Sequence, residues 1–190
     1  MLSERMHTTD LGLGPFYPVI KPLDQDADLT VIQGKSGRAQ GQVIYVMGQV
    51  LNLKGEPIQG AEVEIWQANT FGRYTHPHDT NPAPLDPNFE GYGIQITDTE
   101  GRYRFRTIKP GAYPASEDWI RPPHIHFCVT SRTNRFITQL FFEGEPFNEK
   151  DLLLKCASNK ESLITKLMPP AKDVEPDALI ALWDIVLRQR

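Results

Sequence analysis

Prolines and glycines recur along almost the whole length of this chain. The 190 residues include 16 prolines and 14 glycines, which separate short segments of apolar or alternating side chains. This distribution is typical of many short strands joined by turns. We therefore expect an all-β fold, a two-sheet β-sandwich with long loops and one short helix near the C-terminus.

The length fits one domain with a hydrophobic core of its own. Residues 1–42 are irregular and rich in glycine, proline and polar side chains. We interpret them as an N-terminal arm that belongs to the same domain. Residues 43–190 then form the β-sandwich, and any catalytic site is expected on its long loops.

Alternating side chains predict the individual strands. The segments 94–97 and 102–106 flank a turn at 98–101, which predicts a hairpin in which Tyr103 and Phe105 face inward. The other predicted elements are strands at 43–51, 61–66, 124–130 and 135–142, a helix at 159–167 capped by Asn159, and a closing strand at 182–187.

The charge and the N-terminal sequence exclude several classes of partner. The formal net charge is −4 at pH 7, so no basic patch indicates binding to nucleic acid. Residues 1–7 lack the apolar region of a signal peptide, and no apolar run approaches membrane-spanning length. We expect a cytoplasmic protein, provided that no leader has been removed. Of the two cysteines, Cys128 is expected to be a small buried side chain.

Two histidines two residues apart begin the predicted strand at 124–130. His124 and His126 project from the same face of such a strand, about 7 Å apart along it, so one metal ion could bind both. The opposite face, with Ile125, Phe127 and Val129, is apolar and suits the core. Taken alone, the pair fits two half-buried sheet histidines equally well.

Each of the two long loops carries a tyrosine. Tyr74 lies in the loop at 67–93, and Tyr113 stands in the loop at 109–123 where nearby prolines stiffen the backbone. Either one alone could simply anchor its loop. Two phenols together with two imidazoles suit Fe(III), which lowers the phenol pKa and binds the phenolate, whereas zinc more typically takes histidine, cysteine or carboxylate. His76 and His78 are rival ligands, expected at the rim of the site.

Several linked motifs carry a resemblance to a known family. In the order in which they occur, they run over residues 64–69, 72–74, 83–89, 105–114, 121–127, 137–144 and 183–188. With these motifs the chain from about residue 43 onward resembles the intradiol ring-cleaving dioxygenases, and within them the iron-bearing chains of the protocatechuate 3,4-dioxygenase branch.

The resemblance implies one non-haem Fe(III) with four protein ligands. Tyr113 and His126 would be the axial ligands, and Tyr74 and His124 the equatorial ones. An ortho-diphenol substrate would bind the iron through both oxygens and release Tyr113, which with a bound hydroxide takes up the two substrate protons. O2 would then cleave the ring between the hydroxyls to give a cis,cis-muconate-type diacid.

Three further residues gain roles from the same resemblance. Arg121 would stabilise negative charge on the substrate, and the alternative is a surface salt bridge. Gln139 would border the site by hydrogen bonding. Trp66 would form a wall of the substrate pocket, although either of these two residues could simply belong to the core.

Two departures from the family pattern bear on substrate and assembly. Ala115 stands where the related enzymes carry a second tryptophan, so the pocket is expected to be wider. The chain lacks the long N-terminal helical segment that joins subunits in catechol 1,2-dioxygenases, so it resembles the protocatechuate branch, in which iron-bearing chains pair with a related chain. From this branch and from the irregular N-terminal arm we expect an oligomer, either of identical chains or with a related chain. Hydroxyquinol and substituted catechols stay open as substrates, and a non-catalytic partner subunit and a zinc hydrolase stay open as alternatives.

Overall fold

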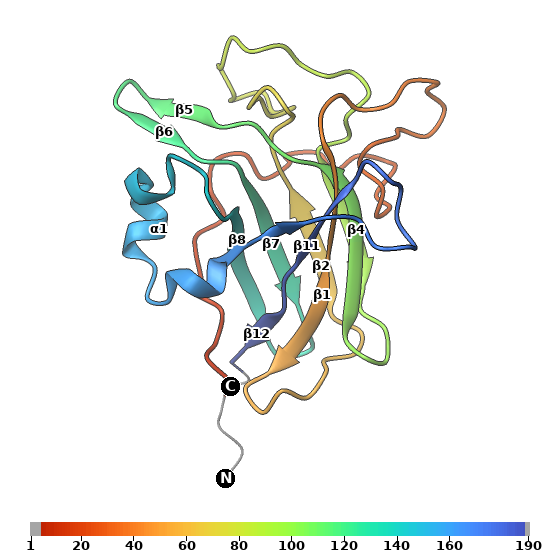
Figure 1. Ribbon diagram of the computed structural model, residues 1–190, viewed down its shortest axis with the longest axis vertical. Helices are drawn as coiled ribbons and strands as arrows, with labels where there is room; N and C mark the ends of the chain where they lie inside the picture. The colour runs from red at the N-terminus through yellow and green to blue at the C-terminus, as the bar shows by residue number, and fades with distance from the viewer. Residues whose placement is uncertain (1–4, 189–190) are drawn as a thin grey trace.

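The computed structural model describes residues 5–188, and its main body is a sandwich of two β-sheets (Figure 1). Each sheet contains five strands, a separate two-stranded ribbon projects from them, and the α-helix is short and lies toward the C-terminus. The predicted two-sheet β-sandwich with one short C-terminal helix is confirmed.

The first sheet is built around the long strand β1. Antiparallel β4 pairs with one edge of β1, and β11 and β12 pair in parallel with successive parts of the other edge. The members of this sheet are β1 (Val43–Asn52), β4 (Arg102–Ile108), β10 (Leu167–Met168), β11 (Leu179–Leu182) and β12 (Ile185–Leu187).

The second sheet has the order β3-β2-β7-β8-β9 and holds the histidine pair in its central strand. Its strands are β2 (Glu62–Trp66), β3 (Tyr92–Ile96), β7 (His124–Thr130), β8 (Arg135–Phe142) and β9 (Ile164–Thr165). The separate ribbon pairs β5 (Tyr113–Ser116) with β6 (Trp119–Arg121).

The core lies between the two sheets and follows the predicted alternation. Ile125, Phe127 and Val129 of β7 are completely buried there, together with Tyr103 and Phe105 of β4. The other face of β7 is also buried, because the arm and the loops cover it. Cys128 on that covered face is completely buried, as expected.

The predicted hairpin at 94–106 is wrong. Residues 92–96 pair with β2 in the second sheet, whereas residues 102–108 pair with β1 in the first sheet. The turn between them therefore carries the chain from one sheet to the other. Alternation correctly gave the inward faces of the strands, but it cannot identify the partner of a strand.

The predicted helix at 159–167 is also wrong. Residues Lys160–Leu163 form only a 3-10 turn, and the chain continues as β9 and β10. Within the described residues, the side chain of Asn159 makes no capping hydrogen bond. The α-helix is α1 (Leu152–Cys156), which Asp151 caps by accepting a hydrogen bond from the backbone N–H of Leu154.

The predicted closing strand at 182–187 is divided in two. Residues 179–182 and 185–187 pair with β1 as β11 and β12. The indole of Trp183, between the two strands, packs against Phe127 in the core. In the part of the chain from residue 5 to 188, no helix is both long and apolar enough to cross a bilayer. The cytoplasmic location stays a prediction.

Candidate metal centre

The side chains expected at the metal centre meet on the covered face of the second sheet. Tyr74 comes from the β2–β3 loop, and Tyr113 begins the β5–β6 ribbon, which lies at the same end of the sandwich as that loop (Figure 1). His124 and His126 stand on β7. Each of these four side chains is at most 5% exposed.

The phenol oxygen of Tyr74 lies at the centre of this group. Its distance to His126 Nε2 is 3.0 Å, and its distance to His124 Nε2 is 3.4 Å. The ring of Tyr113 lies 5.5 Å from the ring of Tyr74 and 5.5 Å from that of His124. Two phenols and two imidazoles therefore share one buried volume.

The hydrogen bonds of His124 determine which nitrogen faces the phenols. A carbonyl oxygen only accepts, so the contact of 2.7 Å between Nδ1 and the Pro122 carbonyl places the proton on Nδ1. The lone pair is then on Nε2. Burial and the nearby Arg121 lower the pKa of His124 and of His126 well below the usual value, so both imidazoles are neutral at pH 7.

The two tyrosines are protonated in the absence of a cation. Burial raises the pKa of Tyr74 well above its usual value, and the neighbouring Tyr113 raises it further. Burial also raises the pKa of Tyr113, although the charge of Arg121 acts in the opposite direction. An ion that binds here must therefore displace two phenol protons, which requires a strong Lewis acid.

Arg121 is a buried cation at the edge of the phenol–imidazole group. Its NH1 lies 3.1 Å from His124 Nε2, and its NH2 donates to Gln139 Oε1 at 2.8 Å. The carboxylate of Asp151 accepts from Arg121 Nε at 2.9 Å. Arg121 is therefore no surface residue, and its ion pair is inside the protein.

The register of the sheet places two of the predicted residues on either side of His126. Trp66 is its partner on β2, and Gln139 is its partner on β8. The indole of Trp66 stacks on the imidazole with ring centroids 4.8 Å apart. Because directly paired residues share a face of the sheet, both side chains border the same site as the histidine.

The loops that carry the two tyrosines are tied to one another. The backbone N–H of Gly111 donates to the carbonyl of Asn69 at 2.9 Å. Gly72 has φ +79°, and a Cβ there would collide with the carbonyl oxygen of Ala112. This close crossing of the two loops holds Tyr74 and Tyr113 on the same side of β7.

The N-terminal arm closes the site from outside, which the sequence did not predict. The ring of Phe16 lies 4.6 Å from that of Tyr74, and the ring of Tyr17 packs edge-on at 5.0 Å from Trp66. The arm is held by the buried Glu64, which accepts from Tyr17 Oη at 2.7 Å and pairs with Lys21 at 2.8 Å. Burial acts to raise the pKa of Glu64, but the hydrogen bonds from Lys21 and the tyrosines hold it below the usual value.

A cavity of about 540 Å³ adjoins Tyr113 and Arg121. This volume is within the range of small-ligand sites. Its lining includes Phe16, Tyr113, Trp119, Arg121, Gln139 and Leu153.

The rival histidines lie apart from the central group. His76 is half-buried beside Phe16, and His78 is exposed. The Nδ1 of His76 accepts a hydrogen bond from the backbone of His78 at 3.2 Å. The structure thus places both at the rim, where they were expected.

The donor set of the central group fits Fe(III). Phenolate is a hard anionic ligand, and two of them offset most of the charge of a trivalent ion. Neutral imidazoles provide two more donors. His126 Nδ1 is buried and has no hydrogen-bond partner among residues 5–188, so the ring is held by its stacking on Trp66 and by the contact of Nε2 with Tyr74.

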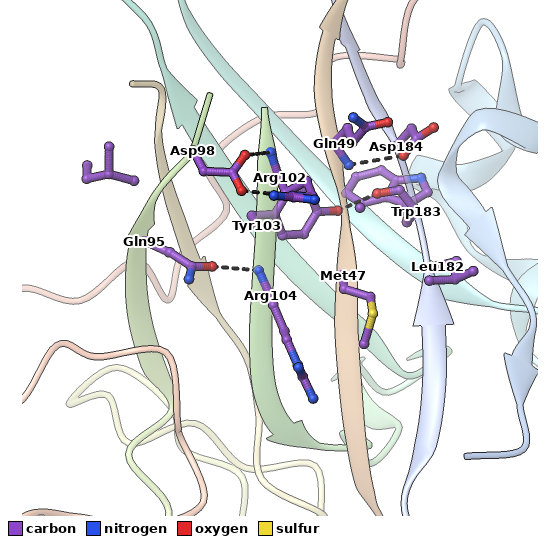
Figure 2. A pocket seen from close by; sticks show the side chains of 12 residues that line it. Met47, Gln49, Gln95, Asp98, Arg102, Tyr103, Arg104, Leu182, Trp183 and Asp184 are labelled. Atoms are coloured by element: carbon purple, nitrogen blue, oxygen red, sulfur yellow. Dashed lines mark hydrogen bonds and ion pairs between the residues drawn. The ribbon is translucent and has the colours of Figure 1, made fainter. Parts of the chain in front are cut away.

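A second cavity, of about 670 Å³, lies against β1 and β4 of the first sheet (Figure 2). It is bordered by the outer face of β1 and β4 and by residues near β3. Asp98 pairs with Arg102 at 2.8 Å, and Gln49 and Asp184 are joined by a hydrogen bond through the Gln49 backbone. Its charged groups are exposed, so it does not provide the buried donor set of the first site.

Comparisons with known proteins give a family match over most of the chain. A family model described as "Dioxygenase" matches residues 13–189. The chain is 44% identical over 176 residues to the "Protocatechuate 3,4-dioxygenase beta chain" of Burkholderia cepacia, covering 89% of this chain and 73% of that protein. It is 30% identical to the "Hydroxyquinol 1,2-dioxygenase" of Rhizobium sp. over 80% of this chain, and spans 52% of that protein.

Solved structures of dioxygenases have a fold similar to that of this chain. The catechol 1,2-dioxygenase of Acinetobacter sp. ADP1 superposes with a TM-score of 0.74 at 25% identity, over 95% of this chain and 62% of that one. The dioxygenase domain of a carbohydrate-binding fusion protein from Streptomyces sp. SirexAA-E gives a TM-score of 0.71 at 27% identity, over 96% and 99% of the two chains.

Proposed function

The chain belongs to the intradiol ring-cleaving dioxygenase family, and from this premise we propose that it cleaves an ortho-diphenol ring between its two hydroxyl groups with O2. The proposed cofactor is one non-haem Fe(III), held by Tyr74, Tyr113, His124 and His126. The observation that supports this most is the position of Tyr74 Oη, 3.0 Å and 3.4 Å from the two imidazole nitrogens.

The bound ferric ion would supply Lewis acidity, which favours ionisation of the substrate hydroxyls and activates the ring toward O2. The proposed role of Tyr113 is to accept a substrate proton at its phenolate oxygen, as a general base. Tyr113 lines the cavity beside the metal centre, where a substrate hydroxyl could reach it. Arg121 would stabilise the negative charge that develops on the ring.

Two neighbours of His126 would shape the pocket. Trp66 stacks on the imidazole and would limit the movement of that ligand. Gln139 Nε2 is buried and has no partner within the described chain, so it is a donor for an oxygen atom of the bound substrate. Together with the arm, these side chains would exclude bulk water from the reacting ring.

The favoured substrate is a protocatechuate-like ortho-diphenol. Support comes from the relative named as a protocatechuate 3,4-dioxygenase chain, at 44% identity. Hydroxyquinol and substituted catechols are the alternatives. Relatives named as a hydroxyquinol 1,2-dioxygenase and a catechol 1,2-dioxygenase match at 30% identity, and the chain spans about half of their length.

The test is a substrate panel assayed with the iron-loaded protein. Protocatechuate, catechol, hydroxyquinol and a chlorocatechol are compared by ring-opening absorbance and by O2 uptake. We expect one mole of O2 consumed per mole of ring opened, with protocatechuate giving the highest kcat/KM. Absence of O2 uptake with every ortho-diphenol, at full iron content, would refute the proposal.

We also infer that the chain functions in an oligomer, because its relative is named as a beta chain. Light scattering on the purified protein, alone and with any co-purified related chain, tests this. A monomer that is fully active by itself would contradict it.

A further inference from the structure

Asp151, which caps α1, is also a buried carboxylate beside the metal centre. It is completely buried and lies between the 3-10 turn Asn148–Lys150 and α1. Its Oδ1 accepts from the backbone N–H of Leu154 at 2.9 Å, and its own N–H donates to the carbonyl of Phe147 at 3.0 Å. The local backbone thus fixes the position of this carboxylate.

The carboxylate holds one edge of the Arg121 guanidinium. Asp151 Oδ2 accepts from Nε at 2.9 Å, and Oδ1 lies 3.4 Å from NH2. The side chains are 5% and 0% exposed, and the rings of Trp119 and Phe141 lie 5.5 Å and 5.9 Å from the guanidinium carbon. Water therefore screens this ion pair much less than an exposed pair.

The two terminal nitrogens of the guanidinium also face the proposed ligand His124 and Gln139. NH1 lies 3.1 Å from His124 Nε2, and NH2 donates to Gln139 Oε1 at 2.8 Å. Because a guanidinium only donates, the amide of Gln139 must present its oxygen to Arg121 and keep Nε2 free. The orientation of two pocket side chains therefore depends on where Arg121 is held.

We propose that Asp151 is a positioning residue, which fixes Arg121 and, through it, the Gln139 amide toward the substrate side of the metal centre. This inference rests on the proposed dioxygenase function. An arginine side chain has several freely rotating bonds, and a bidentate carboxylate restricts the planar guanidinium to one orientation. Without the carboxylate charge, the guanidinium would still be present, but its orientation would no longer be fixed. This loss of orientation lowers the rate of the chemical step.

The first test is Asp151→Asn, which keeps the shape of the side chain and an acceptor for the Leu154 N–H. Removing an outer partner of a functional group typically costs about 10- to 100-fold in activity, and we expect such a loss in kcat. Iron content and KM should change by less than about threefold. The control is Glu175→Gln, because Glu175 pairs with Arg106 at 2.8 Å on the other sheet and should be neutral for kcat. A wild-type kcat in Asp151→Asn would overturn the proposal.

The second test asks whether Asp151 acts through Arg121. In an Arg121→Met background, Asp151→Asn should cause no further loss of kcat, whereas an independent loss would contradict a positioning role. Combining Arg121→Met with Asp151→Leu replaces the buried ion pair by apolar side chains and should restore thermal stability. We expect this double variant to keep the low kcat of Arg121→Met, and recovery of kcat would show that the pair is only structural.

A third readout does not depend on turnover. In the full chain before iron loading, the Nε–H of Arg121 should exchange with solvent at least tenfold more slowly than that of Arg102, measured by nuclear magnetic resonance. Asp151→Asn should remove most of this protection. Fast exchange in the wild type would overturn the inference even if the enzyme is active. Slow exchange with no ring cleavage would instead refute the proposed function and leave the positioning geometry supported.

Discussion

The outer faces of the two sheets differ in what covers them. On the first sheet, Asp98 and Arg102 are 43% and 59% exposed and form their ion pair in water (Figure 2). Against the outer face of the second sheet, Arg121 of the β5–β6 ribbon and Asp151 at the start of α1 form a pair at nearly the same distance, but this pair is buried. Equal contacts therefore differ in strength, because solvent screens the first pair and not the second.

The largest expected effect concerns the histidines on the covered face. His126→Ala removes a proposed ligand, so the purified protein should lose nearly all of its iron and, with the iron, all detectable turnover. The matched control is His76→Ala at the rim, which should retain iron. Stoichiometric iron in His126→Ala, measured by elemental analysis, would count against the ligand assignment, and loss of iron in His76→Ala would favour the rival site.

The two arginines give the next contrast. Arg121→Met should reduce kcat by about 10²- to 10³-fold at unchanged iron content, the size of effect seen when one stabilising donor is removed from an active site. Arg102→Met, on the open face, should leave kcat within twofold. The kcat and iron content of both variants are compared with wild type. Equal kcat values for the two variants would remove the distinction between the faces.

The next contrast is between two buried tyrosines, Tyr113 at the proposed metal centre and Tyr103 in the core. Tyr113→Phe should keep most of the iron and slow kcat about 10²-fold, because the phenolate that accepts a substrate proton is missing. Tyr103 is equally buried, but its hydroxyl donates to the carbonyl of Trp183 at 2.5 Å in the core. Tyr103→Phe should therefore lower the thermal midpoint without changing kcat. Unchanged turnover in Tyr113→Phe would refute its role as a base.

The smallest expected effect is on stability as a function of pH. Burial, and then Asp24, Asp26 and Asp28, raise the pKa of Glu90 to about 8. Both of its carboxylate oxygens are buried without a hydrogen-bond partner among residues 5–188. The folded state thus holds a proton that the unfolded state releases near pH 4.5, so stability falls as the pH rises from about 4.5 to 8.

Glu90→Gln should remove this pH dependence and raise the thermal midpoint at pH 8 by roughly 2–4 °C. The control is Asp98→Asn on the open face, where the carboxylate is solvated and the midpoint should hardly change. Thermal unfolding at pH 5 and at pH 8 compares the three proteins. A Glu90→Gln variant whose midpoint falls with pH as steeply as that of wild type would contradict the shifted pKa.

The faces of the strands could be predicted from the sequence, but their partners could not. Ile125, Phe127 and Val129 alternate with polar neighbours, and that alternation places them in the core. The same alternation in 94–97 and 102–106 is compatible with either sheet, so the expected hairpin was wrong. The missed helix α1 did leave a signal, because Asp151 precedes three leucines as a helix N-cap would.

The convergence of the two tyrosines and two histidines could be predicted, but the enclosure of the site could not. Tyrosine and histidine types suited to Fe(III) are recognisable in the sequence, and the structure brings them together. The contacts of Tyr17 with Glu64 and of Asp151 with Arg121 span 47 and 30 residues along the chain. No local pattern encodes such contacts, which arise only when the sheets have formed.

The most direct test of the central claim, that two phenolates and two imidazoles share one ferric ion, is the visible absorption spectrum of the iron-loaded protein. We predict a red-brown tyrosinate-to-Fe(III) charge-transfer band at one iron per chain. Tyr74→Phe and Tyr113→Phe, each reconstituted to the same iron content, should weaken or shift it. A colourless protein at full iron occupancy, or a band that neither substitution changes, would contradict the account.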